Sequence, residues 1–512
     1  MNAQAIPLSE APGAAAALER ALILATCTMV TFLYAMTVTI ANVSLPQMQG
    51  ALSATPDQIT WVVTSNLVAT AIMTPLAGWL VARFGRRKLC NFAVIGFGAA
   101  SLACGLADSL GELVVFRALQ GAFGAPLVPV SQAIVLDTYA KRQHGAVIAI
   151  FGMGSVIGPI VGPVAGGWLA EAYDWRWVFY MIVPFALLAL LGTFAFIHDR
   201  AGAAKARLDW LGFLMLALAL ASAQLMLDRG ERADWFDSAE IVAWAAIAAI
   251  ALYAFIVHSA TAQRPFLDPR AFLDRNYSIG LVLVFVFGML NFTPMTLLPP
   301  MLQGISGYPD SVIGFVLGAR GLGTLIAFFL MIFASRLDPR ALILFGFALQ
   351  AVAGWQLTQL DMHPGTATVF WPMAVQGFGV GVLWVSITMV TFATLAPERV
   401  AEGSAVYHMV RNIGSSIHIS LSISLAVRMS RANYAELAER VTPYSEALSL
   451  PWALGAWDLE QARGQAAFAR EMARQAQMIG YLDAFMFFIA TSLVVLPLVF
   501  LIRWKSAAQS AR

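Results

Sequence analysis

Residues 154–167 read Gly154-Ser-Val-Ile-Gly158-Pro159-Ile-Val-Gly162-Pro163-Val-Ala-Gly166-Gly167 and lie inside a long apolar run. Glycines spaced by four residues form a smooth strip along one side of a helix, where another backbone can approach closely. The two prolines remove backbone donors and favour a bend. The pattern therefore predicts either a hinge helix or a closely packed seam between two helices.

The whole chain is apolar. Of its 512 residues, 59% are hydrophobic and only 12% are charged, which is more apolar than a soluble domain requires. Runs of about 18 or more apolar residues, enough to cross roughly 30 Å of hydrocarbon, recur along the sequence. They predict an all-α polytopic membrane protein with fourteen spans, which we place at residues 21–45, 59–82, 89–107, 112–137, 144–170, 177–197, 208–227, 239–257, 277–302, 311–334, 341–360, 367–395, 403–427 and 477–502.

The basic residues of the loops predict the orientation. With the N-terminus inside, nineteen lysines and arginines lie on the cytoplasmic side and three lie in the short outer loops. The positive-inside rule then places both termini in the cytoplasm. Residues 1–20 lack a basic segment of the signal-peptide kind, so we expect the first span to remain in the mature protein.

Composition also excludes several function classes. The net charge of +2 does not indicate a basic surface of the kind that binds nucleic acid. Cys27, Cys90 and Cys104 fall inside predicted spans and show no metal-ligand spacing, so we expect neither a disulfide nor a metal site. Motifs for nucleotide phosphates, for a serine nucleophile and for a zinc hydrolase are missing from the sequence. We therefore expect no enzyme activity, no bound cofactor and no use of ATP.

A short internal repeat suggests two halves. Residues 118–124 (ALQGAFG) and 374–379 (AVQGFG) lie eight predicted spans apart. Two six-helix bundles separated by two inserted helices give that offset, although glycine-rich segments can also match by chance. The predicted organisation is a tail at 1–20, a first bundle at 21–197, two inserted helices with linkers at 198–276, a second bundle at 277–502 and a tail at 503–512. The large outer loop 428–476 is expected to form a cap, a docking surface for a partner, or an amphipathic helix lying on the membrane.

Together these motifs resemble the fourteen-helix drug:H+ antiporter branch of the major facilitator superfamily, the EmrB/QacA type, over essentially the whole chain. The glycine-proline helix is similar to the antiporter motif of that family. Residues 78–88 (GWLVARFGRRK) and 113–121 (LVVFRALQG) look like its loop motif and its span-four motif. Further matches are residues 39–46 (TIANVSLP) and 175–180 (WRWVFY). The matching positions of the loop motif are Gly78, Arg83, Gly85, Arg86 and Arg87.

The resemblance implies a major facilitator fold of two six-helix bundles plus two inserted helices, in a bacterial inner membrane. It also implies export of small, often amphipathic molecules by alternating access, driven by proton entry. Some relatives of this type work with a periplasmic adaptor and an outer-membrane channel. Two departures bear on proton coupling, because Thr37 and Ala82 stand where the family usually has an aspartate.

Ionisable residues inside the spans are the candidates for proton coupling, since each is costly in hydrocarbon. Arg117 lies in span four with Gln120 one turn further on, and it is expected either to pair with a titrating group or to brace backbone carbonyls. Span 403–427 carries a polar stripe at helical spacing, made of Ser404, His408, Arg411, Ser415, His418 and Ser422. His408, His418 and Asp483 are candidate proton carriers, because one of them could replace the missing carboxylate. The alternative is that the two histidines only form hydrogen bonds between helices and that Asp483 caps a helix or forms a pair at the outer interface.

We expect the substrate cavity near the midplane, between the two bundles. Aromatic, methionine and amide side chains suit varied apolar cargo. The candidates are Phe32, Tyr34, Thr37, Gln120, Asn291, Phe292, Met295, Gln376 and Trp384. Pro294, Pro299 and Pro300 predict a broken helix in the outer part of span 277–302, where it could act as a gate.

Three functions remain open at this stage. The leading one is secondary active export of drug-like amphipathic small molecules by alternating access, through proton-coupled antiport. The second is dedicated export of an endogenous metabolite, siderophore or biosynthetic product, with atypical or absent proton coupling. The third is a receptor or enzyme built on a carrier fold, which the missing catalytic and sensor motifs disfavour.

Overall fold

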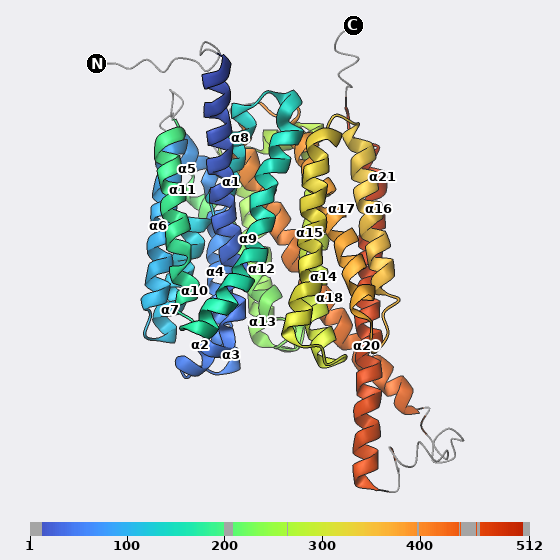
Figure 1. Ribbon diagram of the computed structural model, residues 1–512. Coiled ribbons are helices and arrows are strands. Elements are labelled where there is room, and N and C mark those ends of the chain that lie inside the picture. The colour runs from blue at the N-terminus through green and yellow to red at the C-terminus, as the bar shows by residue number, and fades with distance from the viewer. Residues whose placement is uncertain are drawn as a thin grey trace.

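The computed structural model describes residues 13–198, 208–263, 265–396, 399–439, 441, 457 and 461–504. Within these ranges every regular element is a helix, and the long helices run side by side as one bundle (Figure 1). The prediction of an all-α polytopic chain is confirmed.

The helices fall into three sets along the chain. The first group is α1 (Gly13–Val43), α2 (Leu45–Ala51), α3 (Pro56–Ile59), α4 (Trp61–Met73), α5 (Leu76–Phe84), α6 (Arg86–Leu106), α7 (Leu110–Gly124), α8 (Leu127–Thr138), α9 (His144–Ala172), α10 (Trp177–Tyr180) and α11 (Ile182–Phe196). The inserted pair is α12 (Trp210–Arg229) and α13 (Ala239–Thr261). The second group is α14 (Arg275–Gly304), α15 (Asp310–Ala334), α16 (Pro339–Leu357), α17 (Thr366–Phe392), α18 (Val400–Glu439), α20 (Ala462–Val494) and α21 (Leu496–Val499).

Twelve of the described helical segments are long and apolar enough to cross a membrane. The pair α4 and α5, bent by 57° at Pro75, makes thirteen if it counts as one span. The remaining predicted span lies in α18, whose serines, histidines and arginine make it the most polar of the long helices. The count of fourteen therefore stays a prediction that depends on α18.

One expectation about helix shape is wrong. Pro294, Pro299 and Pro300 do not break span 277–302, because α14 runs without interruption from Arg275 to Gly304 with all three prolines inside it. Neighbouring helices cover most of this segment, and buried packing of that kind can hold a proline-containing helix together. The structure therefore gives no broken helix to serve as a gate there.

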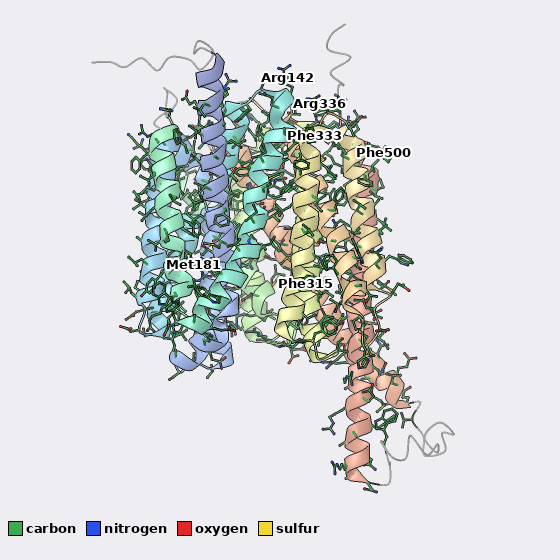
Figure 2. The ribbon with its side chains drawn as sticks, in the orientation of Figure 1. Arg142, Met181, Phe315, Phe333, Arg336 and Phe500 are labelled. Carbon is green, nitrogen blue, oxygen red and sulfur yellow. The ribbon has the colours of Figure 1, made fainter. Side chains whose placement is uncertain are left out.

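The bundle has two distinct ends. At the end that we call the terminal face, α1 begins and α21 ends; at the opposite end, the hairpin face, α18 and α20 project together beyond the other helices (Figure 1). The two groups contact each other at the terminal face, where α18 packs against α5 and α8. There Lys141 Nζ donates to the carbonyl oxygen of Ala393 at 2.6 Å. Arg142 and Arg336, from the two groups, also lie at this face (Figure 2).

The glycine strip of α9 packs against α1. A Cβ atom added to Gly154 would lie 2.4 Å from the carbonyl oxygen of Thr28, and one added to Gly158 would lie 2.6 Å from the backbone nitrogen of Met36. Contacts this short leave no room for a side chain, so the strip forms a closely packed seam. The side chain of Pro163 lies outside the described residues. A hinge role for α9 stays a prediction.

The inserted helix α12 lies between the two groups in the half nearer the hairpin face. Asp228 accepts a hydrogen bond from the hydroxyl of Thr64 on α4. On the other side, Gln224 accepts one from Ser416 on α18 at 2.9 Å. Its partner α13 packs on α12 and turns large apolar side chains outward, such as Ile250 and Tyr253. Thus α12 bridges the two groups, through α4 on one side and α18 on the other, in the half of the bundle nearer the hairpin face.

Candidate functional site

In the first group, Arg117 is the centre of a buried polar network. Its side chain is 1% exposed, its Nη1 donates to Gln120 Oε1 at 2.5 Å, and its Nε donates to the carbonyl oxygen of Val62 at 2.9 Å. Gln120 in turn donates to the hydroxyl of Ser101 on α6 at 2.7 Å. Arg117 thus braces a backbone carbonyl of α4, one of the two roles expected from the sequence.

In the second group, Arg320 on α15 is the centre of a similar network. Its Nε donates to Gln376 Oε1 at 2.9 Å, and its Nη2 donates to Asn291 Oδ1 at 2.6 Å and to the carbonyl oxygen of Asn291 at 2.8 Å. The guanidinium also lies 5.8 Å from the ring centre of Phe292. Asn291, Phe292 and Gln376, expected to line a cavity, therefore enclose a buried cation.

The two networks occupy matching positions in the two groups. Thr70 donates to the carbonyl oxygen of Gly121 at 3.2 Å, and Thr324 donates to that of Gly377 at 2.8 Å. Gly121 directly follows Gln120, and Gly377 directly follows Gln376. Each of these glycines packs against the backbone of the residue four positions before the threonine that binds it. The glutamine-arginine pair therefore occurs twice, but the arginine comes from α7 in one group and from α15 in the other.

The polar stripe on α18 meets two different environments. Near the terminal face, Ser404 and His408 both hydrogen-bond to Gln132 Oε1 on α8 of the first group. Because an amide oxygen only accepts, His408 donates through Nε2 in this arrangement. His408 is thus a titratable side chain that directly joins the two groups.

Nearer the hairpin face, the residues of the stripe contact helices of the second group. Ser415 donates to the carbonyl oxygen of Gly288 on α14 at 2.8 Å. His418 contacts the hydroxyls of Thr293 at 2.7 Å and of Thr491 at 3.3 Å, and its ring stacks on Phe487 at 4.7 Å between ring centres. His418 therefore forms hydrogen bonds between helices of one group, whereas His408 spans two groups.

Arg411 lies between these two histidines. Its guanidinium lies 5.1 Å from the ring centre of Trp384 and hydrogen-bonds to Asn412 Oδ1 at 3.0 Å. Tyr34 on α1, in the first group, lies near this guanidinium. Trp384 contacts the His408 ring at 5.9 Å between centres. The structure thus brings Tyr34, Trp384, His408 and Arg411 to the boundary between the groups.

The other predicted residues are more dispersed. Phe32 packs edge-on against Phe185, with ring centres 5.3 Å apart, and Thr37 donates to the carbonyl oxygen of Leu33 in its own helix at 3.0 Å. Met295 packs in the apolar cluster nearest the hairpin face. Asp483 on α20 makes no hydrogen bond or ion pair to the described residues. These four side chains do not join the boundary cluster.

The loop motif lies at the terminal face. Arg86 forms an ion pair with Asp137, and Arg87 donates to the carbonyl oxygen of Phe194 at 2.7 Å. Gly85 adopts a φ of 85°, a conformation that glycine accepts most readily. Gly78 packs against the backbone of Glu402, so that an added Cβ would lie 2.7 Å from its Cα. Arg83 is exposed.

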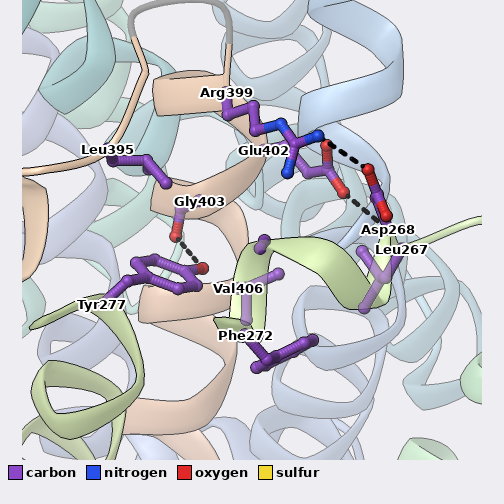
Figure 3. Close-up of a pocket in the computed structure, with 10 residues that line it drawn as sticks. Leu267, Asp268, Phe272, Tyr277, Leu395, Arg399, Glu402, Gly403 and Val406 are labelled. Atoms are coloured by element: carbon purple, nitrogen blue, oxygen red, sulfur yellow. Dashed lines mark hydrogen bonds and ion pairs between the residues drawn. The ribbon is translucent and has the colours of Figure 1, made fainter. Parts of the chain in front are cut away.

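Glu402 lies in the first turn of α18, just before the predicted span 403–427, and borders a small pocket (Figure 3). Its Oε1 accepts the backbone N–H of Asp268 at 3.2 Å, and Asp268 pairs with Arg399 at 2.9 Å. Burial raises the pKa of the Glu402 carboxyl above its ordinary value. The pocket volume of about 10 Å³ has room for roughly one water molecule, so it is too small for the expected cargo.

Sequence reasoning missed several residues that make these contacts, among them Arg320, Gln132 and Asp228. For Arg320 the signal was present, since it is the only charged residue in span 311–334 and charge inside a span marks function. Gln132 and Asp228 become notable only through contacts with α18 and α4, which no local pattern predicts.

Comparisons with known proteins agree with this arrangement. A family model for the Major Facilitator Superfamily matches residues 27–418. The multidrug export protein EmrB of Escherichia coli (strain K12) is 32% identical over 475 residues, covering 92% of this chain and 93% of that protein. The fatty acid resistance protein FarB of Neisseria gonorrhoeae is 32% identical over 424 residues, covering 82% and 83%. The solved structure of the proton:xylose symporter XylE shares the fold, with a TM-score of 0.59 at 12% identity, over 92% of this chain and 96% of that one.

Proposed function

The chain belongs to the major facilitator superfamily, as an EmrB-type multidrug efflux permease, and from this premise we propose that it exports drug-like amphipathic small molecules by alternating access in exchange for protons. The cargo class follows the names of its relatives, of which one is a multidrug export protein and another a fatty acid resistance protein. The terminal face, which carries the basic loops, is the cytoplasmic side in this proposal.

The observation that carries the proposal is the repeated buried network. Arg117 with Gln120, and Arg320 with Gln376, tie together equivalent helices in each group. Two rigid groups of matching construction, joined mainly by helix contacts, can rock against each other around a site at their boundary. At the terminal face the groups are in contact, so the structure represents a state closed on that side.

Proton coupling in this proposal depends on a titratable group at the boundary. His408 supports that role because its hydrogen bond to Gln132 joins the two groups, and opening of the terminal face would break it. His418 and Asp483 remain further candidates for the proton carrier, and Arg117 and Arg411 remain candidates for its charged partner.

Transport by the purified protein in liposomes tests the proposal. We expect an imposed pH gradient to drive efflux of an amphipathic fluorescent dye and substrate addition to cause proton movement. We expect His408→Ala to lose the proton movement, whereas His418→Ala and Asp483→Ala act as parallel tests of the other candidates. Dye efflux that ignores both the gradient and a protonophore would contradict proton antiport. Full coupling in all three variants would reject each assignment.

A partner protein on the outer side is a separate part of the proposal. Helices α18 and α20 project beyond the bundle at the hairpin face (Figure 1). Their projecting segments carry exposed charged residues, among them Arg431, Glu436, Arg463 and Arg470. We propose this hairpin as the docking surface for a periplasmic adaptor that leads to an outer-membrane channel. Deletion of residues 440–460 should leave dye efflux in liposomes intact and lower resistance in cells.

A further inference from the structure

The inserted helix α12 changes how the two groups meet along the bundle. At the terminal face, α18 of the second group packs directly on α5 of the first. Nearer the hairpin face, α18 and α4 both pack on α12. A helix with its side chains is about 10–12 Å across, so α12 holds these two neighbours apart. If the hairpin face closes during alternating access, α12 must therefore leave either α4 or α18.

The polar and aromatic contacts of α12 with the first group are concentrated at its hairpin end. We call them the latch, and it consists of three pairs: Thr64 with Asp228, Trp61 with Arg229, and Thr60 with Arg232. The first pair is a hydrogen bond from a hydroxyl to a carboxylate. In the second, the guanidinium lies 5.6 Å from the ring centre, and the third is a hydrogen bond of 3.2 Å. On each side these residues fall within about one helical turn, so a single small displacement breaks all three contacts.

The contacts of α12 with the second group are spread along the helix. Near the hairpin face, Ser416 of α18 donates to Gln224 Oε1 at 2.9 Å. One turn further along α18, Ser420 donates to the carbonyl oxygen of Leu227, also at 2.9 Å. Closer to the terminal face, Leu216 is 4% exposed and belongs to an apolar core that includes residues of α14 and α17. The second group therefore holds α12 at several levels of the bundle.

The terminal end of α12 is also tied to the second group, through the segment that leads into α14. Asp209, the N-cap of α12, accepts the backbone N–H of Phe266 at 3.1 Å. The ring of Phe213 packs on the ring of Phe266, with ring centres 5.5 Å apart. Asp268, two residues further on, forms an ion pair of 2.9 Å with Arg399, just before α18. These contacts make α12 follow the second group rather than the first.

We propose that α12 is a moving part of the transporter: it travels with the second group, and the latch to α4 opens whenever the hairpin face closes. This inference rests on the proposed alternating access and gives the inserted pair a mechanical role in it. The latch stabilises the state seen here, in which the groups are in contact at the terminal face. Thr64 and Asp228 are then positioning residues, because they act on the balance between the two states.

Covalent links from α12 to one neighbour or the other test which contact opens. In a chain with the three natural cysteines replaced, Thr64→Cys with Asp228→Cys joins α12 to α4, and Ser416→Cys with Gln224→Cys joins α12 to α18. A bifunctional methanethiosulfonate reagent links each pair, and dithiothreitol releases the link. We expect the α4 link to abolish dye efflux from liposomes until it is released, and the α18 link to leave efflux unchanged. Any other pattern of the two links would overturn the proposal.

Distances measured without transport separate this inference from the proposed function. Spin labels at Ala51→Cys and Asp237→Cys report the separation of the first group from the inserted pair, and labels at Asp237→Cys and Thr366→Cys report that of the inserted pair from the second group; all three positions are exposed. When the terminal face opens, as reported by labels at Arg142→Cys and Arg336→Cys, the first distance should change and the second should stay the same. A terminal face that never opens would contradict the proposed function. A terminal face that opens while the first distance stays constant would contradict only this inference.

Removal of one hydroxyl group tests the latch itself. Thr64→Val keeps the shape of the side chain and removes the donor to Asp228, so the ratio of closed to open latch, measured by the first distance, should fall by about tenfold. Asp228→Asn should have a smaller effect, because its amide oxygen still accepts the hydrogen bond. Thr368→Val is the matched control, since that exposed hydroxyl donates only locally, to the carbonyl oxygen of Gly365 at 2.6 Å. If Thr64→Val shifts the ratio no more than Thr368→Val does, while both proteins remain folded by thermal unfolding, the assignment of the latch is wrong.

Discussion

The seam between α1 and α9 predicts a specific cost for one added methyl group. In Gly158→Ala, the new Cβ would lie 2.6 Å from the backbone nitrogen of Met36 and 2.8 Å from the carbonyl oxygen of Phe32. Favourable contacts begin near 3.5 Å, so the two helices must separate by about 1 Å. Overpacking of this kind costs about 1–3 kcal/mol. Because both near atoms belong to backbone, no side-chain rotation can relieve the contact.

Thermal unfolding provides the assay. Cys27, Cys90 and Cys104 are buried and free, so a thiol-reactive dye reports their exposure when the protein unfolds. We expect Gly158→Ala to lower the melting temperature by on the order of 2–5 °C. Gly318→Ala is the control, because Gly318 is also inside a helix but has nothing within 4 Å of an added Cβ. An unchanged melting temperature in Gly158→Ala would refute the close packing of α1 on α9.

Two further predictions concern buried charge. Arg320→Met should leave Asn291 Oδ1 and Gln376 Oε1 with fewer donors and lower the stability of the protein by about 2–5 kcal/mol in the same unfolding assay. Arg336→Met, at the exposed terminal face, should change the stability by less than about 0.5 kcal/mol. Equal effects of the two substitutions would contradict the Arg320 network. Because burial raises the pKa of Glu402, its contact with α5 is most stable at low pH and weakens as the pH rises through the raised pKa. Glu402→Gln should make closure of the terminal face independent of pH, as measured by the distance between spin labels at Arg142→Cys and Arg336→Cys. A pH response equal to that of the natural protein would argue against Glu402.

Local patterns predicted several parts of this structure well. The repeat at residues 118–124 and 374–379 anticipated that Gln120 and Gln376 occupy matching positions, because sequence similarity in a repeat reflects similar packing. The spacing of the α18 stripe placed its polar residues on one side of a helix, which follows from the helical period alone. A bend was not predicted for span 59–82, although Pro75, which lacks a backbone donor, lies at the bend between α4 and α5.

Other parts depend on how helices cross, which local patterns do not contain. The α18 stripe is continuous in sequence, yet His408 meets the first group and His418 meets α14 and α20. A long helix that crosses its neighbours at an angle changes partners along its length, so one stripe can serve two environments. For the same reason the contact of α12 with Thr64 could not be predicted. The prediction of a broken helix from the three prolines of α14 was wrong because packing preserved a helix that local propensity disfavours.

The most direct test of alternating access measures a distance between the two groups at the terminal face. Arg142 and Arg336 are exposed there, and the nearby Gly145 and Ser335 are in contact (Figure 2). Spin labels at Arg142→Cys and Arg336→Cys, in a chain with the three natural cysteines replaced, would report that distance by pulsed electron paramagnetic resonance. The account predicts a short distance as in this structure, with a second, longer population when the pH is raised or an amphipathic substrate is added. A single distance that stays the same under every condition would contradict it.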